Sequence, residues 1–446
     1  MSRPRRAAGI LAACIIAVLG LVAGCSGDAP KPLGEPAPDL PEVPGGAPRL
    51  AVAWLVHDDL DPDALARFDV VIVDMEWTHR DPAGLRRIRA ENPDVTLLAY
   101  VGSQEIMDPD NIASVSDGFR FRKEIAGGID PSWYLKDGEG QPAVFYPGTW
   151  MLNPTTGWPD FLARFVSRDV LSSGLWDGVY YDNAWSNPDW LEDGDIDLDQ
   201  DGRADGDEHG RRWIAETWND AIVRLFDRTR RLAGNDIVLM GNGSAAGYED
   251  YGRRYSPLHH EYLNGALDEH WPSLDRSWPD AVRRAEGWLA RARPEAFFVI
   301  QADPDRAASP TADLRGMRFA LASALLTESH FAYDRGDHGQ DDWWYDEYDG
   351  GGVGRGYLGK EAGPRTRLGG GVWSREFDGG LAVVNPTEQE RTVALPGGPW
   401  EFIRGTQDPE ANPGGPATEI TLAPRDGRIL LRAGGAAAAR TTTAGG

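Results

Sequence analysis

Eight short apolar segments recur along the chain, and they rarely alternate with polar residues. This pattern is typical of parallel strands that are buried on both faces. Several of the segments end in an acidic residue. We predict strands at Leu50–Leu55, Val70–Asp74, Thr96–Val101, Gly178–Asp182, Asp236–Met240, Gly265–Glu269, Ala296–Gln301 and His330–Asp334.

Amphipathic segments separate most of these strands and predict helices. Alternating strands and helices predict a parallel sheet with right-handed crossovers, and eight strands within residues 48–350 predict a (β/α)8 TIM barrel. An open doubly wound sheet is the alternative, but no Gly-rich phosphate loop follows the first strand. The predicted helices are Asp81–Asn92, Trp158–Leu171, Gly210–Leu232, Trp278–Ala292 and Ala312–Leu326.

The pattern changes after about residue 350, where Gly-rich turns separate short strand-like segments. Residues 366–433 therefore predict a small C-terminal antiparallel β-sandwich domain. Residues 434–446 are mostly Ala, Gly and Thr and predict a disordered tail. Two long connections, 102–157 and 183–209, follow the third and fourth strands, so we expect both to build the active face of the barrel.

The N-terminal segment predicts export. Three arginines precede the apolar run Gly9–Val22, and residues 1–24 predict a lipoprotein signal peptide. Leu21-Val22-Ala23-Gly24-Cys25 resembles the bacterial lipobox, so we expect lipidation of Cys25 and anchoring to the membrane on the extracytoplasmic side of a bacterial cell envelope. An ordinary signal peptide or an uncleaved anchor are the alternatives. Residues 25–47 are rich in Pro and small residues and predict a flexible tether.

Composition narrows the set of partners. The formal charge is −25, from 45 basic and 70 acidic residues, which argues against nucleic acid and anionic lipid headgroups as partners. The chain has two cysteines. Cys14 lies in the predicted signal peptide and Cys25 is the predicted lipidation site, so we expect no disulfide in the mature protein. We expect a monomer.

Residues 197–208 match the twelve-residue EF-hand calcium loop. Gly202 stands at the sixth position, where the backbone must turn sharply. No entering helix is predicted before the loop, so we expect an isolated structural Ca²⁺ site of weak affinity. A solvated acidic loop is the alternative. The predicted ligands are Asp197, Asp199, Asp201, the carbonyl of Arg203, Asp205 and Glu208.

Carboxylates at the carboxyl ends of barrel strands lie where TIM barrels place their chemistry. Hydrolysis of a glycosidic bond uses two carboxyl groups. We predict Asp182 as the nucleophile and Glu269 as the acid/base. A structural role is the alternative for Asp182, and Asp268 and Glu261 compete with Glu269. Strand alternation lets only one of Asp268 and Glu269 point into the barrel.

Aromatic residues support a sugar ligand, because flat rings stack on the C–H faces of pyranoses and the chain has 17 Trp and 13 Tyr. Core packing is the alternative explanation for many of them. Acidic residues near strand ends could bind sugar hydroxyls. The predicted substrate-binding residues are Asp74, Glu76, Trp77, Trp185, Trp271, Asp334, Trp343 and Trp344.

The segment Trp176-Asp177-Gly178-Val179-Tyr180-Tyr181-Asp182-Asn183, preceded by Met151-Leu152-Asn153-Pro154, resembles the barrel glycoside hydrolases of hypothetical glycosyl hydrolase family 15. These are similar to the α-amylase and α-galactosidase groups and to polygalactosaminidase-like proteins. The resemblance covers roughly residues 50–350, and Leu381-Ala382-Val383-Val384-Asn385-Pro386 resembles their C-terminal domain.

The resemblance implies that the fourth-strand Asp182 is the nucleophile. Amylase-like enzymes take the acid/base from the fifth strand, which here ends Met240-Gly241-Asn242-Gly243 without a carboxylate. The α-galactosidase-like arrangement takes it from the sixth strand and implies Glu269. The resemblance also implies a retaining mechanism.

We therefore expect a glycoside hydrolase that acts on an extracellular oligo- or polysaccharide. A non-catalytic glycan-binding surface lipoprotein on a barrel scaffold is the second hypothesis. A deacetylase or a lyase is the third, although a deacetylase needs a catalytic metal site that the sequence does not show.

Overall fold

The computed structural model describes residues 45–55, 57–188, 191–243, 259–272, 277–303, 310–334 and 343–434. The predicted signal peptide, the lipidation site Cys25, most of the predicted tether and nearly all of the predicted tail lie outside the described residues. Ala47, the last residue of the predicted tether, is buried, and its N–H donates to the carbonyl of Gly359. No helix in the described ranges is long and apolar enough to span a bilayer.

Eight parallel strands form one nearly closed barrel in the order β1-β2-β3-β6-β7-β8-β9-β10. A single parallel bridge between Leu50 and Phe331 joins the first strand to the last. All eight predicted strands are confirmed, with ends that differ by at most two residues. The strands are β1 (Ala51–Trp54), β2 (Val70–Asp74), β3 (Thr96–Gly102), β6 (Gly178–Asp182), β7 (Val238–Asn242), β8 (Gly265–Asp268), β9 (Phe297–Ala302) and β10 (His330–Tyr333).

The barrel interior is filled by one apolar cluster to which every strand contributes. Among its members are Ile72, Tyr100, Tyr180, Met240 and Leu267. Because side chains alternate along a strand, the residue two positions further on faces the same side. The interior face therefore changes from apolar to polar at the carboxyl ends of the strands.

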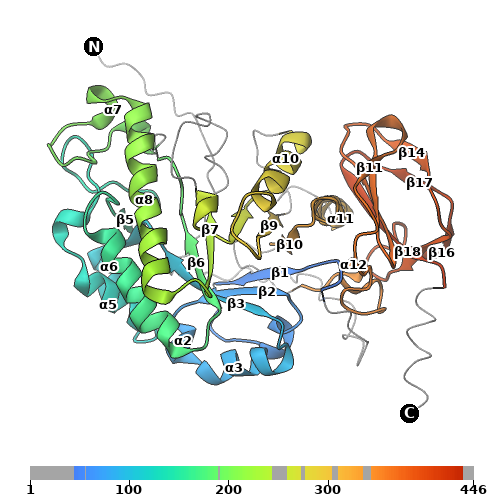
Figure 1. The fold of residues 1–446 in the computed structure, drawn as a ribbon, viewed down its shortest axis with the longest axis horizontal. Helices are drawn as coiled ribbons and strands as arrows, with labels where there is room; N and C mark the ends of the chain where they lie inside the picture. The colour runs from blue at the N-terminus through green and yellow to red at the C-terminus, as the bar shows by residue number, and fades with distance from the viewer. Residues whose placement is uncertain are drawn as a thin grey trace.

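Helices cover the outside of the barrel (Figure 1). Their starts follow local rules: Asp81 accepts from the N–H of Gly84, Ser277 accepts from the N–H of Asp280, and a proline stands in the first turn of each of these helices. The predicted Trp158–Leu171 helix is α-helical only to Phe165 and then passes into a π-helical turn, Val166–Val170. The helices are α1 (Pro62–Leu65), α2 (Trp77–Arg80), α3 (Pro82–Glu91), α6 (Trp158–Phe165), α8 (Arg211–Ala233), α10 (Trp278–Leu289), α11 (Pro310–Thr327) and α12 (Asp346–Asp349).

The two long connections follow the carboxyl ends of β3 and β6 and contain structure of their own. Connection 102–157 holds helices α4 (Pro109–Ser114) and α5 (Arg120–Gly128). It also holds an antiparallel pair, β4 (Glu105–Met107) with β5 (Thr149–Met151). Connection 183–209 ends in the short helix α7 (Asp205–Glu208).

Beyond the barrel lie two antiparallel sheets, which Figure 1 shows in orange and red, with α11 between them and the barrel. Their apolar side chains share one cluster. Two of their strands, Thr366–Arg367 and Pro413–Ala417, were not predicted. The second has the sequence Pro-Gly-Gly-Pro-Ala, which is typical of a turn, and proline is tolerated there because the strand lies at the sheet edge. The strands are β11 (Thr366–Arg367), β12 (Trp373–Glu376), β13 (Gly380–Asn385), β14 (Arg391–Ala394), β15 (Trp400–Arg404), β16 (Pro413–Ala417), β17 (Glu419–Leu422) and β18 (Asp426–Arg432).

Candidate active site

Asp182 lies at the carboxyl end of β6, on the interior face of the barrel. Its side chain is almost fully buried, with 4 % of the residue exposed. Oδ2 accepts from the hydroxyl of Tyr100 at 2.7 Å, and Oδ1 accepts from Nδ2 of Asn242 at 2.8 Å. Burial raises the pKa of the Asp182 carboxyl, and the two donors oppose this rise by stabilising the anion. The carboxylate is thus fixed in position and kept from full solvation.

The main chain around Asp182 is also fixed. Its carbonyl accepts from the N–H of Ser103 at 3.0 Å and from Oγ of Ser103 at 2.6 Å. The next residue, Asn183, is fully buried and has a φ of 53°, in the left-handed region that non-glycine residues rarely adopt. Gly178 is the first residue of β6. A Cβ added to it would lie 1.8 Å from the carbonyl oxygen of Val238, so the close approach of the two strands requires glycine there. Local backbone strain of this kind concentrates at functional sites.

Glu105 is a second buried carboxyl beside Asp182, and the sequence analysis missed it. It starts β4 and is 4 % exposed. Oε1 accepts from Nδ2 of Asn183 at 2.7 Å, and Oε2 lies 3.2 Å from Oγ1 of Thr149. Burial first, and then the charge of Asp182, raise the pKa of Glu105 to about 8. Glu105 lies three residues beyond the end of β3, so a search for acids at strand ends passes over it.

Asp74 and Glu76 hold helix α5 against the barrel. Asp74, at the end of β2, accepts from both terminal nitrogens of Arg122 at 2.9 and 2.5 Å. Glu76 is 1 % exposed and accepts from the N–H groups of Phe121 and Arg122 in the first turn of α5. Burial raises the pKa of Glu76 to about 7, against the effect of Arg122. Both oxygens of Glu76 are engaged by this helix and the residue is buried, so we do not retain it as a substrate-binding residue.

Asp268 is the last residue of β8, and Glu269 is the first residue of the turn that follows. Oδ1 of Asp268 accepts from Nη1 of Arg284 on α10 at 3.0 Å, and both side chains are buried. Asp268 therefore faces the outer helices. Leu267 belongs to the interior cluster, and the half-buried Glu269 directly follows β8, in the turn at the carboxyl end of the strand. Glu261 precedes β8 and lies towards the opposite, amino end of the barrel.

The geometry of neighbouring strands relates Glu269 to Asp182. β7 lies between β6 and β8 in the sheet. Two strand spacings separate β6 from β8 by about 9–10 Å, and both residues stand at the carboxyl ends of these strands. The structure thus brings the two predicted catalytic residues to one end of the barrel, with Asn242 between them.

The predicted aromatic residues divide into core and surface positions. Trp77 and Trp271 are each 4 % exposed and pack in the hydrophobic core, so their ring faces are already covered and we do not retain them as sugar platforms. Trp344 is half-buried with the guanidinium of Arg67 lying 3.9 Å from its ring centroid. Trp343 is half-buried and lines a small cavity with Asp334.

Trp185 is the predicted aromatic residue that lies closest to Asp182 in the sequence. It follows Asp182 by three residues and is half-buried. Its ring lies 4.7 Å from that of Phe145 and covers Gly243, where an added Cβ would come within 2.5 Å of Trp185 Cδ1. Because Gly243 directly follows β7, Trp185 forms an aromatic wall across the ends of β6 and β7.

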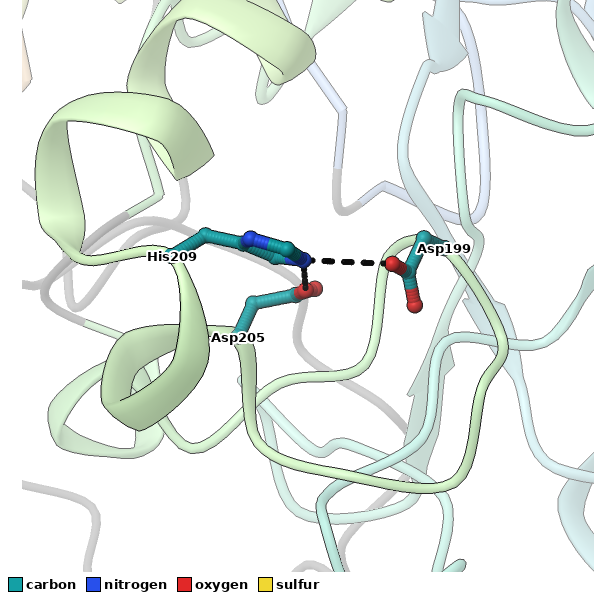
Figure 2. A group of neighbouring side chains, drawn as sticks. All are labelled: Asp199, Asp205 and His209. Carbon is teal, nitrogen blue, oxygen red and sulfur yellow. Dashed lines mark hydrogen bonds and ion pairs between the residues drawn. The ribbon is translucent and has the colours of Figure 1, made fainter.

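The predicted calcium loop gathers its acidic side chains at two points. Asp197, Asp199 and Asp201 each offer an oxygen within 4.8 Å of the others. Figure 2 shows the second group, in which Nε2 of His209 lies 3.3 Å from Asp199 and 3.7 Å from Asp205. Burial raises the pKa of Asp205 to about 6.

The main chain of this loop has the turn that a calcium loop requires, with Gly202 at a φ of 88°. The oxygen donor set fits calcium. Glu208 instead lies 3.5 Å from Arg203 and is not part of either group of carboxylates among the described residues. The imidazole of His209 would also suit a transition metal.

Several solved structures are distantly similar to this chain. An α-glucosyl transfer enzyme, XgtA, is 13 % identical with a TM-score of 0.44, over 86 % of this chain and 98 % of that one. The GH27 β-L-arabinopyranosidase of Geobacillus stearothermophilus is 11 % identical with a TM-score of 0.44, over 86 % and 96 %. The GH36 α-galactosidase AgaA of the same organism is 14 % identical with a TM-score of 0.42; the match covers 87 % of this chain but only 56 % of that one.

These similarities assign no residue of this chain a role. A comparison with curated proteins finds no match. Residues 89–381, more than half of the chain, match the sequence profile of hypothetical glycosyl hydrolase family 15. This range contains Asp182, Glu105 and Glu269. The chain therefore belongs to hypothetical glycosyl hydrolase family 15.

Proposed function

We propose that the protein is a glycosidase whose nucleophile is Asp182. The observation that carries the proposal is a buried carboxylate at the carboxyl end of a barrel strand, held by two hydrogen-bond donors, in a chain of a glycosyl hydrolase family. Chemistry in TIM barrels takes place at this end. A carboxylate that is fixed and only partly solvated is poised to stabilise an oxocarbenium-like transition state without reorganising.

Glu269 is the proposed acid/base. In a retaining mechanism it protonates the leaving oxygen while Asp182 attacks the anomeric carbon, and it then takes a proton from the water that hydrolyses the glycosyl intermediate. Such a mechanism requires the two carboxyl groups to lie about 5–5.5 Å apart, whereas an inverting one requires about 6.5–9.5 Å. We propose the retaining course, an oligo- or polysaccharide substrate, and stacking of one sugar ring on Trp185.

The calcium loop and the lipid anchor complete the proposal. A structural Ca²⁺ held by Asp197, Asp199, Asp201 and Asp205 would remove the repulsion among these carboxylates. The loop lies between β6 and α8, and so it would stiffen a wall of the active face. Lipidation of Cys25 would place the monomeric enzyme on the extracytoplasmic side of a bacterial membrane, where polysaccharides are accessible. Incorporation of a labelled fatty acid, lost in Cys25→Ser, tests this placement.

The enzyme is tested with the form that begins at Ser26, with calcium present, on α- and β-linked polysaccharides and cell-wall glycans. We expect new reducing ends from the wild type and a loss of at least ~10³-fold in Asp182→Asn and of ~10²-fold or more in Glu269→Gln. The matched control is Glu91→Gln, an exposed carboxylate in the last turn of α3 that pairs with Arg87 on the outside of the barrel and should keep its activity.

Each outcome of this experiment has a distinct meaning. Equal cleavage by wild type and Asp182→Asn would remove Asp182 as the nucleophile. Binding of one glycan without cleavage would instead support the second hypothesis, a glycan-binding lipoprotein. The anomeric configuration of the first product, followed by NMR, separates retention from inversion.

A further inference from the structure

We infer that Gln301 is a specificity-determining residue of the active face, and that its side-chain amide binds one hydroxyl group of the sugar ring that reaches Asp182. The inference deepens the proposed function and rests on it for the class of ligand, a pyranose. Two observations carry it: the amide is buried and forms no hydrogen bond with any described residue, and it lines a small cavity.

Gln301 lies on the interior face of the barrel, near the carboxyl end of β9. Phe297 and Val299 of the same strand belong to the interior apolar cluster. Because side chains alternate along a strand, the side chain two positions after Val299 faces the same side. The cross-strand partner of Gln301 is Ala332, which belongs to this cluster as well. Gln301 therefore stands where the interior face changes from apolar to polar.

The wall of the barrel around β9 and β10 lies across from Asp182. Three strands separate β6 from β10 on either side, namely β7, β8 and β9 on one side and β3, β2 and β1 on the other. Asp182 on β6 and Gln301 on β9 both lie on the interior face near the carboxyl ends of their strands. A sugar ring between these walls would thus have the carboxylate on one side and the amide on the other.

Three alanines leave a small cavity beside Gln301, at the seam where a single bridge joins β1 to β10. Ala51, Ala53 and Ala332 occupy interior positions, at which β3 and β6 carry tyrosines. The cavity has a volume of about 10 Å³, which is close to the least that a water molecule needs. It therefore has room for one hydroxyl oxygen, while the sugar ring itself would stay in the mouth of the barrel.

A buried amide without a partner costs free energy that a ligand can recover. Gln301 is 5 % exposed, and its side chain forms no hydrogen bond within the part of the chain that the structure describes. Buried polar side chains nearly always have a partner, and one without a partner has lost its hydration for no return. A sugar hydroxyl can donate to Oε1 or accept from Nε2. Asp334 and Trp343, which the sequence predicted as substrate-binding residues, line the same cavity.

Thermal unfolding of Gln301→Met tests whether the amide lacks a partner in the free protein. Methionine keeps the shape of glutamine and cannot form these hydrogen bonds, so we expect the variant to be at least as stable as the wild type. A clear loss of stability would show that the amide already has a partner, such as an ordered water, and would overturn the inference. The matched control is Gln389→Met, an exposed glutamine among the C-terminal sheets.

Calorimetric titration tests the hydroxyl contact. D-glucose, D-galactose and D-mannose are titrated into the form that begins at Ser26, and the hexose that binds is compared with each of its mono-deoxy derivatives. We expect one derivative to bind the wild type and Gln389→Met about tenfold more weakly than the parent sugar does. Gln301→Met should bind this derivative and the parent sugar equally, because a site that reads a hydroxyl group loses this discrimination with the group that reads it.

The outcomes separate this inference from the proposed function. If none of the three hexoses binds, or if every derivative shows the same relative affinity in Gln301→Met as in the wild type, the inference is overturned. Cleavage of glycans without the expected difference would remove the role of Gln301 and leave the hydrolase. The expected difference without any cleavage would keep Gln301 as a sugar-binding residue and remove the hydrolase.

Discussion

At the scale of single residues, the site depends on how Asp182 is kept ionised although it is buried. Burial raises the pKa of its carboxyl, and the donors Tyr100 and Asn242 lower it. The phenol of Tyr100 is itself buried beside Asp182, which raises its pKa well above the ordinary value, so it remains a donor throughout the working range. The donors therefore decide the acid limit of activity.

Tyr100→Phe removes one donor and keeps the ring in the barrel core. A hydrogen bond to a charged group is worth about 1.5–3 kcal/mol, so the pKa of Asp182 should rise by about 1–2 units. Asp182 must be ionised to attack, and the acid limb of the kcat/KM profile should move to higher pH by that amount. Tyr181→Phe is the control, because Tyr181 pairs with Thr229 on the other face of the same strand. An acid limb that stays in place in Tyr100→Phe would show that Tyr100 does not tune Asp182.

The sequence predicted some of these residues and not others. Asp182 ends a strand as an isolated carboxylate and is visible without a structure. Asn242 was not considered as a site residue, because the search was for carboxylates at strand ends and the fifth strand ends without one; Asn242 instead pairs with β8 at the end of β7. Glu105 becomes a neighbour of Asp182 because Gly102, three residues before it, pairs with Asp182 across β3 and β6, and the Asn183–Glu105 hydrogen bond joins residues 78 apart in the chain. Contacts of that separation leave no local pattern in the sequence.

At the scale of elements, the barrel was predictable because each strand repeats the same local rule. Apolar, β-branched and aromatic residues fill a strand that is buried on both faces. The short elements of the long connections were not predicted, because helices of four to nine residues depend on tertiary contacts more than on their own propensity. Helix α5 is an example, since Glu76 from a different element caps its first turn.

The calcium loop makes an element-scale prediction. Calcium at about 100 times its dissociation constant should raise the free energy of unfolding by about 2.7 kcal/mol, and a chelator should remove this gain. Amide exchange in α7 and the first turn of α8 should slow when calcium binds. Asp197→Asn should abolish both effects.

The control for the loop is Asp207→Asn, because Asp207 is an exposed acid of the same loop that lies outside both carboxylate groups. It should behave as the wild type. Stabilisation by zinc and not by calcium, lost in His209→Ala, would assign the site to the group in Figure 2. A loop that no metal stabilises would contradict the calcium proposal.

At the scale of the whole molecule, a buried charge network joins the barrel to the C-terminal sheets. Arg318 on α11 is 3 % exposed and donates to Asp408 at 2.8 Å. It also lies 3.5 Å from Asp426 and 3.9 Å from Glu347. Glu347 accepts from Asn412 at 2.8 Å. These carboxylates come from α12 and from the C-terminal sheets and their loops, so one cation links several parts of the chain.

Arg318→Met tests whether this network holds the two parts together. Removing one partner leaves buried carboxylates without a cation, and we expect the free energy of unfolding to fall by about 3–5 kcal/mol. Burial already raises the pKa of Glu347, and Arg318 opposes this rise. Removal of the Arg318 guanidinium should therefore raise the pKa of Glu347 further. The folded variant then holds a proton that the unfolded chain releases.

This linkage makes the loss of stability in Arg318→Met depend on pH. Between the unfolded pKa of a glutamate, about 4.3, and the raised folded pKa, the folded state binds more protons, so stability falls as pH rises. The deficit of Arg318→Met should be smallest in acid and should grow through this window, measured by urea unfolding at a series of pH values. Arg425→Ala breaks an exposed pair with Glu388 and should change stability little at any pH. If the loss of stability in Arg318→Met does not depend on pH, Arg318 contributes by the packing of its aliphatic stem. If the loss is no larger than that of Arg425→Ala, the apolar contacts between α11 and the sheets hold the two parts together.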